Sequence, residues 1–301
     1  MSEFKSESFN LFHQFHTRLN NYVKISTASI DHLNNYSANK NDLASKINEL
    51  ILNSGERWSP KIYENPMDEV LKIKNDLSQS SIMWVYSSFD VFLNHVHSSY
   101  SDHKVNSDYD SKECYNDIVR LKKLFTSFNW EINDLEYLLV LYDYYALIRH
   151  CVVHNMGKPT KELIKISISK EFLKAMSTWP TKVANRNLSP APTITSTKIS
   201  LMPHHAITYS EVCFRIAKII NSNILKTVGV KFYIRKTAKK FIQDSTHLTK
   251  PVSNNSYNFI INKIFENYNL KSVKIDEIKS AFSEEELKEI NKTYLKKKNI
   301  I

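Results

Sequence analysis

The stretch from Tyr142 to Pro159, YDYYALIRHCVVHNMGKP, decides how this part of the chain folds. Apolar residues in and before it recur at spacings of three and four, which predicts a helix with one face turned toward a core. That face consists of Leu135, Leu138, Leu139, Tyr142, Tyr145, Arg149 and Val152. Arg149 is always charged and costly to bury without a partner, so we expect this face to meet a ligand or a second subunit.

The same stretch predicts where the helix ends. Gly157 and Pro159 follow His154, and a glycine with a proline shortly after it is typical of a helix C-terminus. The partial negative charge at that end favours a protonated imidazole. Five residues at about 100° each place Arg149 and His154 well apart around a straight helix. Only a frayed last turn or a partner subunit would bring the two side chains together.

The segment RHCVVHNMG, in which Arg149 is followed by His154, Asn155 and Gly157, resembles the Arg-x4-6-His motif of HEPN domains. HEPN domains are small helical bundles that usually form dimers, and many are metal-independent ribonucleases. The resemblance covers roughly residues 60–227 and implies that Arg149 and His154 are catalytic. It also implies a homodimer that acts on RNA without a cofactor, as a microbial toxin or an abortive-infection effector in defence against phage.

Three further residues are supporting candidates. HEPN proteins often carry an acidic residue in an earlier helix that pairs with the motif arginine, and Asp90 matches that place. The alternative for Asp90 is a solvated carboxylate on the flank of its helix. His150 occupies the polar position after Arg149, and Asn155 could fix the helix exit or contact a phosphate. Either of these two could instead be a surface residue.

The chemistry of RNA cleavage suits the two motif residues. The 2′-hydroxyl of RNA can act as the nucleophile, so the protein has to supply only a proton-transfer group and a cation on the phosphate. The imidazole of His154 can move the proton, and the guanidinium of Arg149 can hold two phosphate oxygens. The sequence therefore predicts a metal-independent endoribonuclease.

Two alternatives to this prediction stay open. His150 and His154 lie four residues apart and could bind zinc together, but Cys151 stands where the zinc-protease motif has its glutamate. No cysteine-rich segment offers further ligands, so we expect no metal cofactor. The second alternative is a HEPN-type bundle without catalysis, which would be an RNA- or protein-binding regulator or an antitoxin partner.

Composition limits the remaining classes. The chain has 301 residues, 42% of them hydrophobic, and only three glycines, which favours a large helical core over sheets and phosphate loops. Neither the dinucleotide-binding fingerprint nor the Walker pattern is present. Three widely spaced cysteines, Cys114, Cys151 and Cys213, fit a reducing cytoplasm. The first residues lack a secretion signal and the longest apolar segment contains Asp143, so we expect a cytoplasmic protein that does not cross a membrane.

We expect an all-α protein with three parts. Residues 1–59 are predicted to form an N-terminal helical extension, residues 60–227 the HEPN-like bundle, and residues 228–301 a basic helical region. Within the bundle, helices are predicted near residues 67–78, 81–100, 112–128 and 133–155, and from Thr208, which has the spacing of a capping box with Glu211. Alternating polarity in residues 163–169 and 193–202 predicts a short β-hairpin insertion.

The formal net charge of +10 favours a polyanionic partner. Cations and aromatic rings alternate in KFYIRKTAKKF, residues 231–241, so an RNA strand could place its phosphates on the charges and its bases on the rings. The candidate RNA-binding cations are Lys231, Arg235, Lys236, Lys239 and Lys240. The alternative is an amphipathic helix that uses these aromatic rings as core.

Overall fold

The computed structural model describes residues 4–35, 40–59, 61–105, 117–132, 135–179, 182–183, 186–187, 189–243 and 255–298. Within these residues the chain forms eleven α-helices, one short 3-10 helix and four strands of two residues, so the all-α prediction is confirmed. The arrangement specific to HEPN domains stays a prediction. Cys114 and the predicted helix start at residue 112 lie outside the described residues.

The helices are α1 (Glu7–Asn35), α2 (Lys40–Asn53), α3 (Pro66–Ser99), α4 (Asp117–Ser127), α5 (Glu136–His154), α6 (Lys161–Ser167), α7 (Lys170–Ser177), α8 (Pro203–Gln243), α9 (Ser256–Tyr268), α10 (Ile275–Ala281) and α11 (Glu284–Lys298). The 3-10 helix η1 (Ser101–His103) follows α3. The strands are β1 (Lys182–Val183), β2 (Arg186–Asn187), β3 (Thr193–Ile194) and β4 (Ile199–Ser200).

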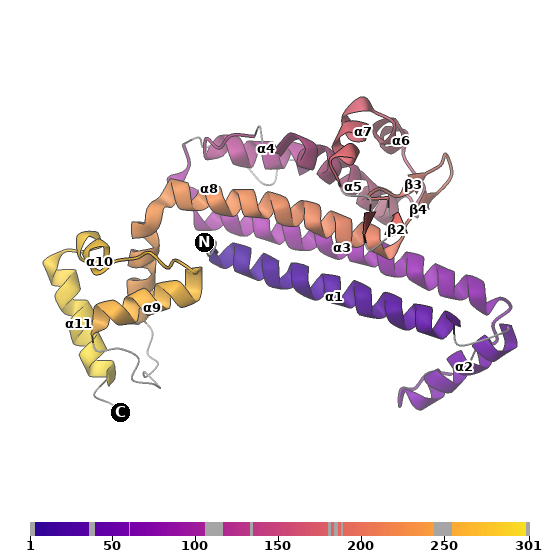
Figure 1. Ribbon diagram of the computed structural model, residues 1–301, viewed down its shortest axis with the longest axis horizontal. Helices are drawn as coiled ribbons and strands as arrows, with labels where there is room; N and C mark the ends of the chain where they lie inside the picture. Colours follow the sequence, from indigo (N-terminus) through magenta and orange to yellow (C-terminus); the bar gives the residue numbers. More distant parts are fainter. Residues whose placement is uncertain are drawn as a thin grey trace.

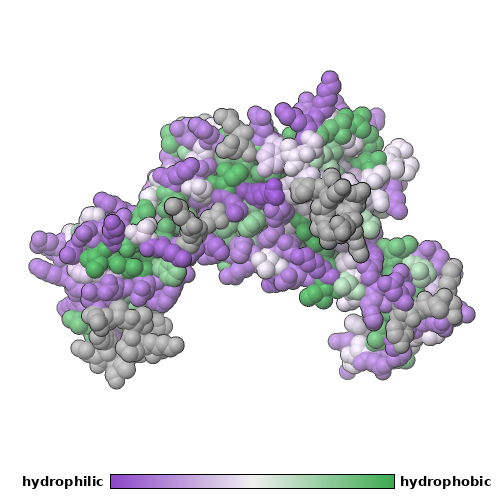
Figure 2. Space-filling view, viewed as in Figure 1, coloured by the Kyte–Doolittle hydropathy of each residue, from purple (hydrophilic) through white to green (hydrophobic). Residues whose placement is uncertain are grey.

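Three long helices, α1, α3 and α8, lie side by side and form the central bundle (Figure 1). Helices α4 and α5 lie along one side of this bundle, and α6, α7 and the strands extend from that side. Two lobes diverge from its ends, α2 at one end and α9 to α11 at the other. The molecule therefore has the outline of an arch, which the space-filling view also shows (Figure 2).

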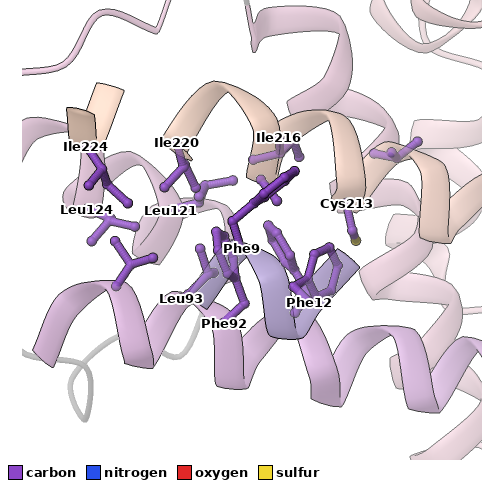
Figure 3. Packing of buried hydrophobic residues seen from close by; sticks show 14 of the residues in the cluster. Phe9, Phe12, Phe92, Leu93, Leu121, Leu124, Cys213, Ile216, Ile220 and Ile224 are labelled. Atoms are coloured by element: carbon purple, nitrogen blue, oxygen red, sulfur yellow. The ribbon is translucent and has the colours of Figure 1, made fainter. Parts of the chain in front are cut away.

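The core of the bundle is built from aromatic and branched aliphatic side chains. Phe9 and Phe12 of α1 pack against Phe92 of α3, and Ile216 and Ile220 of α8 lie over them (Figure 3). All five side chains are almost completely shielded from solvent. Each fully buried side chain of this size stabilises the fold by about 1.5–3 kcal/mol. Helix α1, which the sequence assigns to an N-terminal extension, therefore lies inside the central bundle.

The start of the chain is fixed between the bundle and the C-terminal lobe. Asn221, buried on α8, accepts a hydrogen bond from the Ser6 amide at 2.8 Å and donates one to the Phe4 carbonyl at 2.6 Å. The Lys5 amide donates to the carbonyl of Tyr268 in α9 at 2.9 Å. A buried side-chain amide whose two ends are both paired fixes the direction of the chain that it contacts.

Helix α8 breaks at Gly229, where φ is 71° and ψ is 170°. This conformation is open to glycine and strained for any residue with a Cβ. Before Gly229 the helix belongs to the central bundle, and after it the helix supports α9, α10 and α11 (Figure 1). The boundary predicted at residues 227 and 228 falls beside this break.

Three predicted elements need correction. Helix α3 is continuous where a joint near residue 79 is predicted, because its buried face continues through Leu77, Ser81 and Ile82. Residues 163–169 lie largely in α6 and form no strand. Thr160 caps that helix by accepting a hydrogen bond from the Leu163 amide at 3.2 Å.

The third correction concerns the start of α8. This helix begins at Pro203, so Thr208 lies inside it and donates to the His204 carbonyl, while Glu211 pairs with Arg215 at 2.9 Å.

The hairpin predicted in residues 193–202 is confirmed, with β3 and β4 paired antiparallel. Among the described helices, none has both the length and the apolar character that a membrane crossing requires.

Candidate functional site

The site begins with the end of α5, a helix whose Tyr145, Ile148 and Cys151 are fully buried. The helix ends at His154 as predicted. The amides of Asn155 and Gly157 both donate to the Cys151 carbonyl at 3.0 Å, and Met156 and Gly157 adopt left-handed conformations with φ of 52° and 76°. The last turn is therefore closed by hydrogen bonds, and the frayed turn considered from the sequence is not observed.

Arg149 is half-buried on the side of α5 that faces α3. Its guanidinium carbon lies 4.4 Å from the centre of the Tyr86 ring, which is a cation–π contact. Within the part of the chain that the structure describes, Arg149 has no ion pair with a carboxylate. Its N–H groups are therefore not taken up by an acidic side chain, and they can bind an anionic ligand.

Asp90 does not pair with Arg149, and this prediction is wrong. Its carboxylate pairs with Arg120 of α4, and Arg120 also donates to the side chain of Asn94. Arg120 is only 9% exposed, so it needs this carboxylate more than the half-exposed Arg149 does. Arg120 stands four residues before the buried Leu124, so both lie on the inward face of α4.

His150 and His154 lie on the outer side of α5. Both rings are exposed, and their centres are 4.9 Å apart with an angle of 46° between the planes. The regular helix places His154 about 140° around the axis from Arg149. The structure therefore brings the two histidines together, but it does not bring Arg149 and His154 onto one face of a single chain.

Asn155 serves the helix exit through its backbone. Its amide donates to Cys151, and its carbonyl accepts from the Lys158 amide at 3.0 Å. Gly157 faces α3, since a Cβ built on it would lie 3.9 Å from the side-chain nitrogen of Gln79. The loop after α5 therefore lies beside α3, the helix that carries Tyr86.

The end of α5 has a basic surface. From residue 144 to residue 161 the chain contains no aspartate or glutamate, while Arg149, Lys158 and Lys161 carry positive charge. Both lysines are exposed. A segment with three fixed cations, two imidazoles and no carboxylate attracts a polyanion such as an RNA backbone.

The aromatic residues of the basic segment 231–241 are part of the core. Tyr233 is fully buried and Phe241 nearly so, and the hydroxyl of Tyr233 lies 3.1 Å from that of Tyr100. These rings cannot stack on bases, which supports the amphipathic helix as the alternative predicted above. Arg235 donates to the Ala281 carbonyl at 2.8 Å, and Lys236 pairs with Glu7 at 2.8 Å.

Four of the five predicted RNA-binding cations are exposed on this helix, Lys231, Arg235, Lys239 and Lys240. Their role in RNA binding stays a prediction. Because Tyr233 and Phe241 are buried, these cations supply mainly the part of the binding that depends on charge.

A second cluster has residue types found in catalytic triads. His16 of α1 lies 2.8 Å from the Ser210 hydroxyl and 3.7 Å from the Glu211 carboxylate, and its ring stacks on Phe214 at 4.5 Å. Ser210 has no exposed surface, so no substrate can reach its hydroxyl. Burial lowers the pKa of His16, although Glu211 acts in the opposite direction. The cluster joins α1 to α8.

An apolar groove lies between α1 and α3. Leu11, Phe15 and Val91 line it with Ser87 and His95, and its volume is about 260 Å³. Leu11 is 59% exposed and Val91 66% exposed. Exposed apolar surface that is concentrated in a groove is typical of a site where another molecule binds.

The described residues contain no group of three or more histidine, cysteine, aspartate or glutamate side chains placed to hold a metal ion. The chain matches no protein-family model, no curated protein and no solved structure.

Proposed function

We propose that this protein is a metal-independent endoribonuclease of the HEPN type, acting in the cytoplasm as a toxin or an abortive-infection effector. Arg149 carries the proposal. It is half-buried, is positioned by the ring of Tyr86 and has no carboxylate partner in the described chain. A fixed arginine of this kind, in a segment without acidic residues, is suited to bind a phosphate.

The proposed reaction uses the 2′-hydroxyl of RNA as the nucleophile. Arg149 holds two oxygens of the scissile phosphate and stabilises the charge that builds on them. His154 takes the proton of the 2′-hydroxyl or gives one to the departing 5′-oxygen. The bond from phosphorus to the 5′-oxygen breaks as the bond to the 2′-oxygen forms, so the products carry a 2′,3′-cyclic phosphate and a 5′-hydroxyl.

The geometry of α5 favours a site shared by two protomers. Arg149 and His154 point to different sides of one regular helix, and the closed last turn keeps them there. A homodimer could place Arg149 of one protomer beside the partner subunit's His154. Each dimer would then contain two equivalent shared sites, as two-fold symmetry requires.

The first test is cleavage of end-labelled transfer and messenger RNA in the presence of EDTA. We expect the wild-type protein to cut, and Arg149→Ala and His154→Ala each to lower the rate by about 100-fold or more. His95→Ala serves as a matched control for cleavage, because His95 is an exposed histidine of α3 that lines the groove with α1 and is not part of the proposed nuclease site. Equal cutting by all four proteins would sink the assignment.

The second test asks whether the site is shared. The Arg149→Ala and His154→Ala proteins are unfolded together, refolded and assayed as a mixture. If each site takes its arginine and histidine from different protomers, half of the dimers regain one of two sites, and about one quarter of the wild-type rate returns. If both residues come from one protomer, no activity returns.

The second candidate function is a non-catalytic module that binds RNA or a regulatory protein such as an antitoxin. The groove between α1 and α3 is the observation that favours it, because its exposed apolar side chains suit an amphipathic helix. An absence of cleavage, with RNA or protein still bound, would support this function. In that case Val91→Glu should weaken protein binding more than His154→Ala does.

A further inference from the structure

His150 and His154 have the arrangement of a two-ligand metal site. Residues four apart on an α-helix differ by about 40° around its axis, so both imidazoles project from one side of the last turn of α5. Their ring centres are 4.9 Å apart. Zinc–nitrogen bonds of about 2.0–2.1 Å place two nitrogens of a tetrahedral ion roughly 3.3 Å apart, and rings at this separation can reach that distance by small side-chain rotations.

In a second close histidine pair of the described residues, each ring already has a hydrogen bond to the backbone. His204 and His205 have ring centres 4.1 Å apart, but the Met202 amide donates to Nδ1 of His205 at 2.9 Å and His204 binds the Ser189 carbonyl at 3.0 Å. His205 is also buried. By contrast, His150 and His154 are exposed, and neither ring has a hydrogen bond within the described residues.

The electrostatics of this helix end act in both directions. The carbonyls of the last turn carry partial negative charge, which favours a cation beside His154. Arg149 and Lys158 lie in the same segment and oppose it. Two protein ligands leave two or more positions for water, so we expect weaker binding than at structural zinc sites, which have four protein ligands.

We propose that His150 and His154 bind a divalent transition-metal ion such as Zn²⁺, and that the bound ion inhibits the protein. Imidazole suits zinc, nickel and copper, whereas magnesium and calcium prefer oxygen ligands. The ion occupies the imidazole nitrogen of His154 that would otherwise move a proton. The inhibition rests on the proposed function, but the binding does not.

Binding is tested by isothermal titration of zinc chloride into the full-length protein after removal of metal by EDTA and dialysis. We expect one site per chain in the wild type and in the His95→Ala control, and loss of that site in His150→Ala and in His154→Ala. Because both rings are exposed, these variants should keep their helical circular dichroism. An unchanged zinc isotherm in His150→Ala would overturn the site, and so would equally strong binding of magnesium.

Inhibition is tested by the ratio of cleavage rates with and without zinc, taken for each protein against its own baseline. The wild type should slow by at least tenfold when the site is saturated and recover with EDTA, whereas the ratio for His150→Ala should stay near one. A wild-type rate that zinc leaves unchanged would overturn the inhibition. If no variant cleaves RNA but zinc binds as described, the proposed function fails and the metal site stands.

Discussion

At the scale of single residues, the ring of Tyr86 determines where the guanidinium of Arg149 lies. The contact is 4.4 Å long and joins α3 to α5. A cation–π contact near the surface contributes about 0.5–1 kcal/mol, so Tyr86→Leu should lower RNA cleavage by about two- to fivefold. Tyr86→Phe keeps the ring and should retain most of the rate. Equal rates for the leucine and phenylalanine variants would show that the ring does not position Arg149.

The pair of Asp90 and Arg120 concerns stability rather than chemistry. Asp90→Asn removes the charge of a carboxylate that contacts a buried guanidinium, and we expect a loss of about 1–3 kcal/mol in the free energy of unfolding. Urea unfolding followed by circular dichroism measures this loss. Adding Arg120→Met should recover part of it, because the guanidinium that lost this carboxylate is removed. Recovery by Arg149→Met instead would mean that Asp90 pairs with Arg149.

These same residues show how much of the site could be predicted from the sequence. The motif and the glycine after it were enough to predict that α5 ends at His154 and that Arg149 lies on its apolar side. The partner of Asp90 depends on how α4 crosses α3, which no local pattern specifies. The cluster of His16, Ser210 and Glu211 could not be predicted either, because His16 is nearly 200 residues away from its partners in the sequence.

At the scale of the elements, helix α8 changes direction at Gly229, in a conformation that only glycine adopts without strain. Its φ of 71° and ψ of 170° strain any residue that has a Cβ, although a Cβ there would meet no atom within 4 Å. Gly229→Ala should therefore lower the free energy of unfolding by about 1–3 kcal/mol through backbone strain alone. Thermal unfolding tests this, with Ser222→Ala on the exposed side of α8 as control. A Gly229→Ala protein as stable as its parent would contradict the break.

The elements themselves differ in how well the sequence predicts them. Long segments with regular apolar spacing, such as α1 and α5, are predicted correctly, because burial of one face dominates their stability. Short segments are not, since the alternation in residues 163–169 fits a strand or a single helical turn equally well. The capping hydrogen bond that Thr160 accepts from the Leu163 amide then favours the helix.

At the scale of the whole molecule, contacts between residues distant in the sequence join the three regions predicted from the sequence. Asn221 holds residues 4 and 6, and Lys236 pairs with Glu7, so the start of the chain contacts both halves of α8. Such contacts depend on the three-dimensional arrangement of the helices. The predicted division into extension, bundle and basic region could not include them.

The pH dependence of stability is a property of the whole molecule, since it depends on which histidines the fold buries. Burial, with the nearby charge of His204, lowers the pKa of His205 from 6.5 to about 3, and Nδ1 of His205 accepts the Met202 amide. The unfolded chain takes up a proton near pH 6.5 and the folded chain only near pH 3. Stability is therefore fully present above pH 6.5 and falls as the pH decreases toward 3.

His205→Asn tests this dependence, because asparagine can still accept the Met202 amide but does not titrate. Between pH 7 and pH 5 the wild type should lose about 2 kcal/mol through His205, with further losses from His16 and His204, whose pKa values burial also lowers. The asparagine variant should keep only the losses from His16 and His204. Urea unfolding at the two pH values measures the difference within each protein, so any change in absolute stability cancels. The exposed-site control His95→Asn should lose as much stability between pH 7 and pH 5 as the wild type. If His205→Asn also loses that much, His205 does not become protonated on unfolding.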